Sequence, residues 1–290
     1  MKPDDAALRP AGASQATVTP HRAGRTEHST DWLADEVPVA LVFNGISHAV
    51  MLATPADLED FALGFGLTEG LLAEASELHD VDVQETRLGI EVHMEVAGAC
   101  EFRLKERRRN LTGRTGCGLC GTESLEHVHR SLPEFTLGSQ RIHVTTAAVG
   151  RALRSLRAAQ VLQQSTGAAH AAAWCGPDGE ALLLREDIGR HNALDKLAGA
   201  MSRAGTDASQ GFVCVTSRAS FEMVQKTAMI GASMLVAVSA PTVLAVRTAQ
   251  AAGLALAGFA RRDDFVAYTA PERFGLSSSI APVSTDSATD

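Results

Sequence analysis

The second half of the chain alternates short apolar runs with longer segments in which apolar residues recur every three or four positions. The runs predict strands at 169–175, 181–186, 211–216, 234–238, 254–260 and 265–268. The periodic segments predict helices at 147–164, 190–204, 221–230 and 243–253. Strands that are apolar throughout need cover on both faces, so the alternation predicts an α/β fold with helices layered on a mixed sheet.

The preceding part of the chain predicts a smaller unit of another kind. Strands are expected at 37–43, 47–53, 81–86 and 88–96. The pair Asn44-Gly45 between the first two is a strong signal for a tight hairpin. Thr54, followed by proline, predicts the start of a helix that runs to about residue 72. Residues 28–97 are therefore predicted to form a β-rich α+β unit.

Four further segments complete the predicted organisation. Residues 1–27 mix small and polar types without period, which predicts a disordered leader. Residues 98–121 are basic and aperiodic, which predicts a mobile loop. The α/β core is expected to occupy 122–273. The Ser- and Thr-rich residues 274–290 predict a loose tail.

A pair of thiols, Cys117 and Cys120, ends the basic loop. Glycines flank both thiols. Residues 101–116, which come just before the pair, contain six arginines and lysines and only two glutamates. Nearby cations lower the pKa of a thiol, and the thiolate is its reactive form. The chain as a whole has a net charge of −8, which argues against a general nucleic-acid binder. The basic run therefore predicts a phosphate-bearing ligand or an acidic patch on a partner.

Cysteine usage also indicates where such a chain works. Five cysteines, an odd number, without a secretory pattern at the N-terminus predict reduced thiols and a cytoplasmic protein. Cys175 and Cys214 lie in apolar runs and are predicted to be core residues. The apolar runs are too short to span a bilayer, so no membrane association is expected.

Four chemistries are open for the thiol pair. A structural zinc site fits the spacing, but His127 and His129 stand too close together to supply the second ligand pair. A zinc deaminase needs proline before the first cysteine, where this chain has Gly116. A dithiol–disulfide oxidoreductase and a persulfide-based sulfur carrier both suit an exposed thiolate. The residues alone do not separate these last two.

Polar residues gather where three predicted core strands end. Ligands of layered α/β folds bind outside the carboxyl ends of strands, where arginines and helix starts favour phosphate. Plain helix capping or an ordinary charged turn explains each group equally well. Together the groups predict a nucleotide-phosphate pocket on one sheet edge. The candidate residues are Asp187, Arg190, His191 and Asn192, then Ser217 and Arg218, and then Phe259, Ala260, Arg261, Arg262, Asp263 and Asp264.

Several of these motifs together resemble one known family. The motifs are RTGCGLCG at 114–121, DIGRHN at 187–192, TSR at 216–218 and YT at 268–269. With these motifs, the chain resembles the FdhD-type formate dehydrogenase accessory sulfurtransferases from about Asp31 to Arg273.

The resemblance carries its own expectations. It implies a cytidine-deaminase-like core without the deaminase zinc residues, so without a metal of its own, in a cytoplasmic homodimer. Cys117 would accept sulfur from a cysteine desulfurase as a persulfide, with Cys120 as its neighbour in the transfer. The acceptor would be the bis(molybdopterin guanine dinucleotide) form of the molybdenum cofactor, which then enters formate dehydrogenase. Residues 259–264 would match the cofactor-binding segment, although the family often has Gly and a later Arg where this chain has Arg262 and Asp264.

Two other functions are weighed against sulfur transfer. One is a molybdenum-cofactor chaperone whose thiols only contact the cofactor. The other is a thiol–disulfide oxidoreductase, which would cycle a Cys117–Cys120 disulfide.

Overall fold

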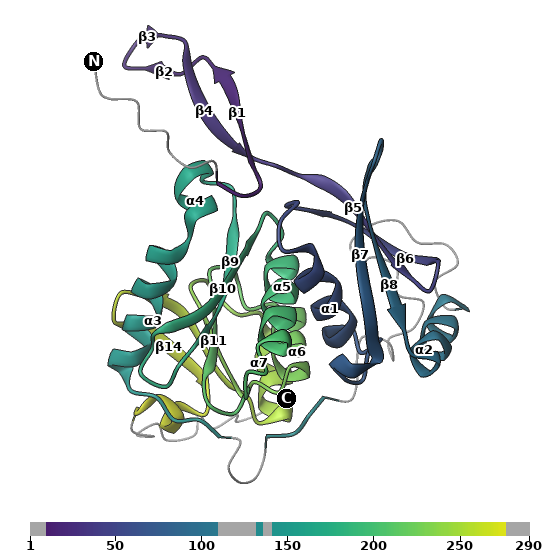
Figure 1. Cartoon of the computed structure of the whole chain (residues 1–290). Helices are drawn as coiled ribbons and strands as arrows, with labels where there is room; N and C mark the ends of the chain where they lie inside the picture. The colour runs from purple at the N-terminus through teal and green to yellow at the C-terminus, as the bar shows by residue number, and fades with distance from the viewer. Residues whose placement is uncertain (1–9, 110–131, 136–140, 277–290) are drawn as a thin grey trace, which may run out of the picture.

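The computed structural model describes residues 10–109, 132–135 and 141–276. It contains a large sheet with helices on both faces, a smaller sheet covered by one helix, and a narrow ribbon near the N-terminus (Figure 1). The large sheet mixes parallel and antiparallel pairs, so the predicted layered α/β core is confirmed.

The large sheet has six strands in the order β10-β9-β11-β12-β13-β14. They are β9 (His170–Cys175), β10 (Ala181–Asp187), β11 (Phe212–Val215), β12 (Met234–Ala237), β13 (Ala255–Arg261) and β14 (Asp264–Thr269). Strands β11, β12 and β13 run parallel, whereas β9, between β10 and β11, is antiparallel to both. The carboxyl ends of β10, β11, β12 and β13 therefore lie at the same edge of the sheet.

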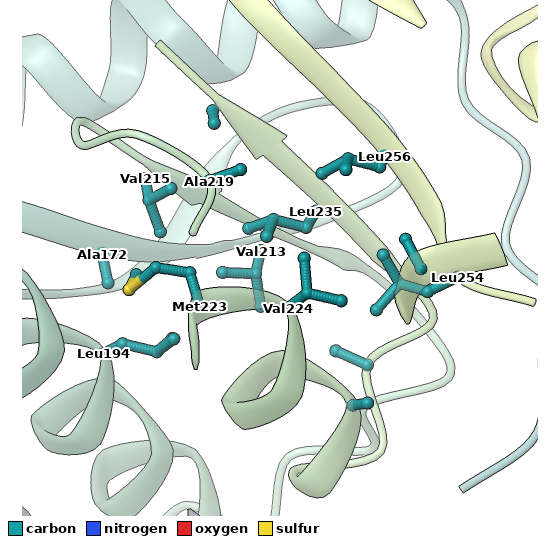
Figure 2. Packing of buried hydrophobic residues seen from close by; sticks show 14 of the residues in the cluster. Ala172, Leu194, Val213, Val215, Ala219, Met223, Val224, Leu235, Leu254 and Leu256 are labelled. Carbon is teal, nitrogen blue, oxygen red and sulfur yellow. The ribbon is translucent and has the colours of Figure 1, made fainter. Parts of the chain in front are cut away.

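Alternate residues of the central strands face two separate hydrophobic cores, as the period of two in a strand requires. On one face, Val213 and Leu235 pack with Met223 of a covering helix (Figure 2). On the other face, Cys214 and Val236 belong to a second cluster. The first face is covered by α5 (Arg190–Arg203), α6 (Phe221–Met229) and α7 (Val243–Ala252), and the second by α3 (Thr146–Ala159).

The helix predicted over 147–164 is two helices, α3 and the short α4 (Val161–Thr166). The break falls at Gln160, whose backbone leaves the helical region. The Glu186 carboxylate at the end of β10 accepts hydrogen bonds from the amides of Leu162 and Gln163. An acceptor from a distant strand thus gives α4 its own N-terminus, which local periodicity could not show.

The smaller sheet has the order β6-β5-β8-β7 and is packed on α1. Its elements are β5 (Val37–Phe43), β6 (Ile46–Ala53), α1 (Leu58–Thr68), a 3-10 helix (η1, Ala75–Glu77), β7 (Leu78–Thr86) and β8 (Gly89–Val96). Asn44 and Gly45 both have positive φ, 43° and 75°, so the predicted tight hairpin is confirmed.

The predicted start of α1 at Thr54 is wrong. The helix begins at Leu58, because the backbone amide of Thr54 donates to Asp187 and its hydroxyl accepts from the amide of Ile188. The helix ends at Thr68 rather than near residue 72. Gly70, with φ 62°, turns the chain, and the amide of Leu72 folds back onto the carbonyl of Gly66.

The predicted disordered leader is also wrong for much of its length. A ribbon of β1 (Ala13–Val18), β2 (His21–Arg22), β3 (Arg25–Thr26) and β4 (Ser29–Ala34) occupies this part of the chain. Strands β1 and β4 pair antiparallel from Ala13 with Ala34 to Val18 with Ser29. Figure 1 shows the ribbon extending away from the two sheets. Because β1 pairs with residues beyond the predicted leader, its own sequence carries no signal for it.

The first half of the predicted basic loop is a helix, α2 (Gly98–Arg109). Cys100 and Leu104, one turn apart, are buried in the core of the smaller unit. The guanidinium of Arg103 donates to the carbonyl of Leu71 and pairs with Glu77. These contacts anchor the first half of α2 to the smaller unit. The thiols Cys117 and Cys120 lie outside the described residues, as do 122–131.

The C-terminal boundary is likewise later than predicted. A 3-10 helix (η3, Pro271–Phe274) follows β14, and Phe274 is fully buried against the α3 side of the large sheet. Residues 277–290 lie outside the described chain, and the predicted domain limits otherwise stay a prediction.

Glycines let the smaller unit dock on the core. A Cβ at Gly64 of α1 would lie 1.7 Å from the carbonyl oxygen of Asp195, and a Cβ at Gly199 of α5 would lie 1.9 Å from that of Asp60. The backbones of α1 and α5 therefore touch, at a separation that no side chain permits.

We predict that Gly199→Ala lowers the free energy of unfolding by about 3 kcal/mol, because the added methyl meets rigid backbone of α1. Chemical denaturation of the purified chain measures this. Gly98→Ala is the matched control, since its Cβ would meet nothing within 4 Å. Equal stability of the two variants would contradict the close packing of α1 on α5.

Candidate functional site

The three predicted groups of polar residues lie along one edge of the large sheet, at the carboxyl ends of β10, β11 and β13. Backbone hydrogen bonds connect the second and third groups through the loop after β12. The amide of Ser239 donates to the carbonyl of Ser217 (3.3 Å), and the amide of Phe259 donates to that of Ser239 (3.1 Å). The topological rule that placed these residues together is thus borne out by the strand order.

Asp187 is a buried scaffold residue at this edge. One carboxylate oxygen lies 2.7 Å from the Lys196 ammonium and accepts from the amide of Thr54. The other accepts from the amide of Gly189 (2.8 Å) and from the side chain of Asn192 (3.0 Å). Asp187 is fully buried and its oxygens are occupied. The alternative that it caps α5 is wrong, because the N-cap is Gly189, and its contact with a ligand stays a prediction.

Asn192 belongs to the same scaffold. Its side chain is buried and also donates to the carbonyl of Leu52 in β6 (2.8 Å). Together Asp187 and Asn192 attach the start of α5 to the smaller unit. The described contacts of Asn192 are thus structural, and its contact with a ligand stays a prediction.

Arg190 and His191, between these two residues, have a different environment. The Nε atom of Arg190 is buried and has no acceptor among the residues that the structure describes. His191 Nε2 lies 2.7 Å from Glu222 at the start of α6, and both side chains are about one quarter exposed. Burial, the largest single influence, would raise the pKa of Glu222, but the hydrogen bond and charge of His191 together with the charges of Lys226 and Arg190 lower it. This carboxylate therefore stays ionised beside the imidazole.

Two further residues at this corner were not predicted. His170, at the start of β9, has a pKa lowered by burial and then by the charges of Arg190 and His191. Ser220, the N-cap of α6, has a buried hydroxyl without a partner in the described chain. Ser220 ends the polar stretch 216–220, whose hydroxyls at a helix start favour an anion, whereas His170 belongs to no such stretch and reaches this edge only through the antiparallel pairing of β9. Arg190, His191, His170 and Ser220 are named the basic corner below.

Ser217 and Arg218 also differ from each other in their exposure. Ser217 is buried and its hydroxyl donates to the carbonyl of Arg218, so it shapes the loop after β11. Arg218 is exposed at the edge. The basic corner with Arg218 has donors and positive charge at the N-termini of α5 and α6, an arrangement that suits phosphate oxygens.

The segment 259–264 comprises the end of β13, the turn at 262–263 and the first residue of β14. Phe259 has φ 51° at an irregularity in the strand pairing, and its side chain is 46% exposed. Ala260 is fully buried, so its side chain contacts the core and not a ligand. Asp263 lies 2.8 Å from Arg154 of α3, on the face of the sheet opposite α5 and α6. The turn shares the edge with the basic corner but leans toward the other face.

The remaining members of this turn are accessible. Arg261, Arg262 and Asp264 are exposed. Arg262 has φ 57°, so the turn holds a non-glycine residue in the left-handed region. An exposed aromatic ring beside two exposed arginines suits a ligand that carries both a planar ring and phosphates.

Neither a metal centre nor a membrane segment is identified in the described chain. Within residues 10–109, 132–135 and 141–276, no group of three or more His, Cys, Asp and Glu could hold a metal ion. The helices of the same ranges include none long and apolar enough to cross a bilayer. Cys117 and Cys120 lie outside these ranges.

A model of the FdhD/NarQ family matches residues 34–275. The chain belongs to the FdhD/NarQ family. The resemblance that its motifs indicated is therefore confirmed.

Curated relatives extend the match to nearly the whole chain. A sulfur carrier protein FdhD of Variovorax paradoxus (strain S110) is 57% identical over 273 residues, which cover 94% of this chain and 97% of the relative. A protein of the same name from Cupriavidus necator is 54% identical over 282 residues, with the same coverage of each chain.

A solved structure supports the fold. A crystal structure from Desulfotalea psychrophila, named for a formate dehydrogenase accessory role, matches with a TM-score of 0.71 and 21% identity. The match covers 90% of this chain and 99% of the other. At this identity the comparison concerns the α/β fold alone.

We predict that the loss of folding stability between pH 8 and pH 5 is smaller in His170→Gln than in the wild type. A lowered pKa means that the folded state binds the proton of His170 less well than the unfolded state, whose histidine titrates near pH 6.5. The wild type therefore loses stability as the pH falls through this range, and the variant escapes that loss. Urea unfolding at both pH values measures it, with exposed His143→Gln as control for loss of an imidazole. A difference between pH 5 and pH 8 as large as that of the wild type would refute the prediction.

Proposed function

We propose that this chain is a sulfur carrier that receives a sulfur atom on Cys117 as a persulfide and transfers it to the molybdenum cofactor of formate dehydrogenase. The observation that carries the proposal is the near full-length identity, 57% and 54%, to proteins named sulfur carrier protein FdhD. The proposed donor is a cysteine desulfurase, and the proposed acceptor is the bis(molybdopterin guanine dinucleotide) cofactor. The same proposal makes the protein a cytoplasmic homodimer.

Burial of the other cysteines supports the choice of thiol. Cys100, Cys175 and Cys214 are each fully buried, and burial raises the pKa of the Cys214 thiol to about 12. Burial also raises the pKa of Cys175, together with the neighbouring Cys214. A protonated, buried thiol neither attacks a persulfide nor reaches a partner enzyme. Of the five cysteines, Cys117 and Cys120 are the ones left for sulfur transfer.

Loading of sulfur onto Cys117 requires no external oxidant. The Cys117 thiolate attacks the terminal sulfur of the desulfurase persulfide, a new sulfur–sulfur bond forms, and the desulfurase cysteine leaves as a thiolate. Release requires two electrons at the transferred sulfur. The Cys120 thiolate supplies them by attacking the Cys117 sulfur, which expels sulfide toward molybdenum and leaves a Cys117–Cys120 disulfide. A cellular thiol reductant then restores the pair.

The carboxyl edge of the large sheet suits the phosphates and guanine rings of the proposed cofactor. In the basic corner, Arg190 and Ser220 carry buried donors without acceptors in the described chain, and native proteins rarely leave such atoms unpaired. Phosphate oxygens of the cofactor would satisfy them, with Arg218 adding charge. Phe259 would stack on a guanine ring, and Arg261 would contact the adjoining phosphate.

We predict that incubation with a cysteine desulfurase and cysteine adds one sulfur, about 32 Da, to the peptide that contains Cys117 and Cys120, because the other three cysteines are buried. Peptide mass spectrometry under non-reducing conditions measures the addition. Reductant should remove it, and Cys117→Ala should abolish it. Cys120→Ala should retain the sulfur but fail to release it.

Other outcomes would favour the other functions. With an active desulfurase, absence of added sulfur on both thiols would leave a cofactor chaperone as the better description. A Cys117–Cys120 disulfide that cycles with a protein substrate but never carries sulfur would indicate a thiol–disulfide oxidoreductase.

We predict that Phe259→Ala weakens the binding of guanosine diphosphate about tenfold, since one aromatic–base stack contributes about 1–3 kcal/mol. Isothermal titration calorimetry measures the affinity. Leu182→Ala, which truncates another exposed apolar side chain on β10, is the matched control and should bind as the wild type does. Equal affinity of all three proteins would remove Phe259 from the proposed site.

A further inference from the structure

A cavity of about 360 Å³ lies at the opposite edge of the large sheet from the candidate site. It is formed where α7 ends, β13 begins and β14 ends, whereas the candidate site is formed where β13 ends and β14 begins. Its lining includes two arginines, Arg141 and Arg273, and the apolar side chains of Ala249, Leu254 and Pro271. Figure 2 labels Leu254 at the junction of helix and strand.

Arg273 is a buried cation without a counter-ion in the described chain. Its side chain is 1% exposed. The guanidinium donates to the carbonyls of Ile142, Ser233 and Gly253 and to the hydroxyl of Ser233 at 2.7 Å, all of them neutral acceptors. Burial, and then the charge of Arg141, lowers its pKa to about 10. The charge of Glu272, which acts in the opposite direction, offsets only part of this effect, so the two arginines leave this edge with a net positive charge.

Arg141 has donors to spare. It is exposed, and its Nε donates to the carbonyl of Phe135 (2.8 Å). The rest of its guanidinium has no acceptor among the residues that the structure describes, and it forms no ion pair with them. Its five-donor fork matches the two oxygens of a carboxylate or phosphate.

Acceptors around the cavity are already used by the chain. The carbonyl of Ala249 accepts from the amide of Leu254, and that of Ala252 accepts from the amide of Phe135. The hydroxyl of Thr269 donates to the carbonyl of Leu254. Glu272 also lines the cavity, but it is exposed and pairs with neither arginine within the described chain. The lining therefore has more donors and positive charge than acceptors and negative charge.

We propose that this cavity binds a small organic anion through a carboxylate or phosphate group. Arg141 binds the oxygens directly, Arg273 supplies a fixed positive charge behind it, and the half-buried Pro271 and Tyr268 contact the apolar body. The volume is at the lower end of that of small-molecule sites, which fits a ligand of about ten heavy atoms. The site is separate from the sulfur-transfer proposal and does not depend on it.

The test uses the full-length chain with two probes, sodium benzoate and inorganic phosphate, at an ionic strength matched with sodium chloride. Isothermal titration calorimetry should show saturable binding of at least one probe, and the one that binds identifies the preferred oxyanion. Arg141→Gln should weaken that binding by about tenfold or more, because a charge-assisted pair is lost. Arg157→Gln, which removes an exposed arginine of α3 that does not line the cavity, should bind as the wild type does.

Two results would overturn the proposal. One is absence of saturable binding of both probes to a folded wild type at millimolar concentration. The other is binding that Arg141→Gln leaves unchanged. Arg141 is chosen over buried Arg273 because it is exposed, so its replacement should leave the fold intact. Cys117→Ala should bind the probe normally, which separates this outcome from the fate of the sulfur-transfer proposal.

Discussion

The contact between α1 and α5 is the constraint on which the rest of the described structure depends. Gly64 and Gly199 let the two helices meet backbone to backbone. Around this crossing, two buried lysines tie the units together: Lys196 bonds to Asp187 and the carbonyl of Thr54, and Lys226 bonds to Asp195 and Thr68. Buried ion pairs compensate their desolvation only when geometry is good and every donor is used. The close approach provides that geometry, so packing and electrostatics stabilise one arrangement.

This attachment also gives the residues of one short motif two different roles. In the stretch 187–192, Asp187 and Asn192 face inward and hold the smaller unit, and this leaves Arg190 and His191 at the sheet edge. Helix geometry explains the division, because Asn192 is two residues from Arg190 and therefore points to a different side of α5. A substitution at Asp187 would disturb the basic corner through this scaffold. Polar residues of one motif thus serve the scaffold and the site together.

The sequence predicted the core well, because the apolar periods of its helices and strands are local. It failed where the deciding partner is distant. Strand β1 depends on β4, α4 depends on Glu186, and Thr54 is bound to Asp187 instead of capping a helix. The site shows the same limit. Strand order places three loops at one edge, but packing decides which side chains face outward. Ala260 and Ser217 are therefore buried, and His170 lies near Arg190 and His191 although no local pattern predicts it.

A sulfur carrier with several cysteines must also keep sulfur off the wrong thiols, and the fold achieves this by burial. Cys175 and Cys214 are buried in the same hydrophobic cluster, on the side of the large sheet that α3 covers. A thiolate there would be desolvated, so the pKa values of both thiols are raised. Cys100 is buried in the core of the smaller unit, beneath α2. Sulfane sulfur passes between thiolates, so a thiol that stays protonated is excluded from the exchange. The packing that stabilises the sheets thus also removes three of the five cysteines as competing acceptors.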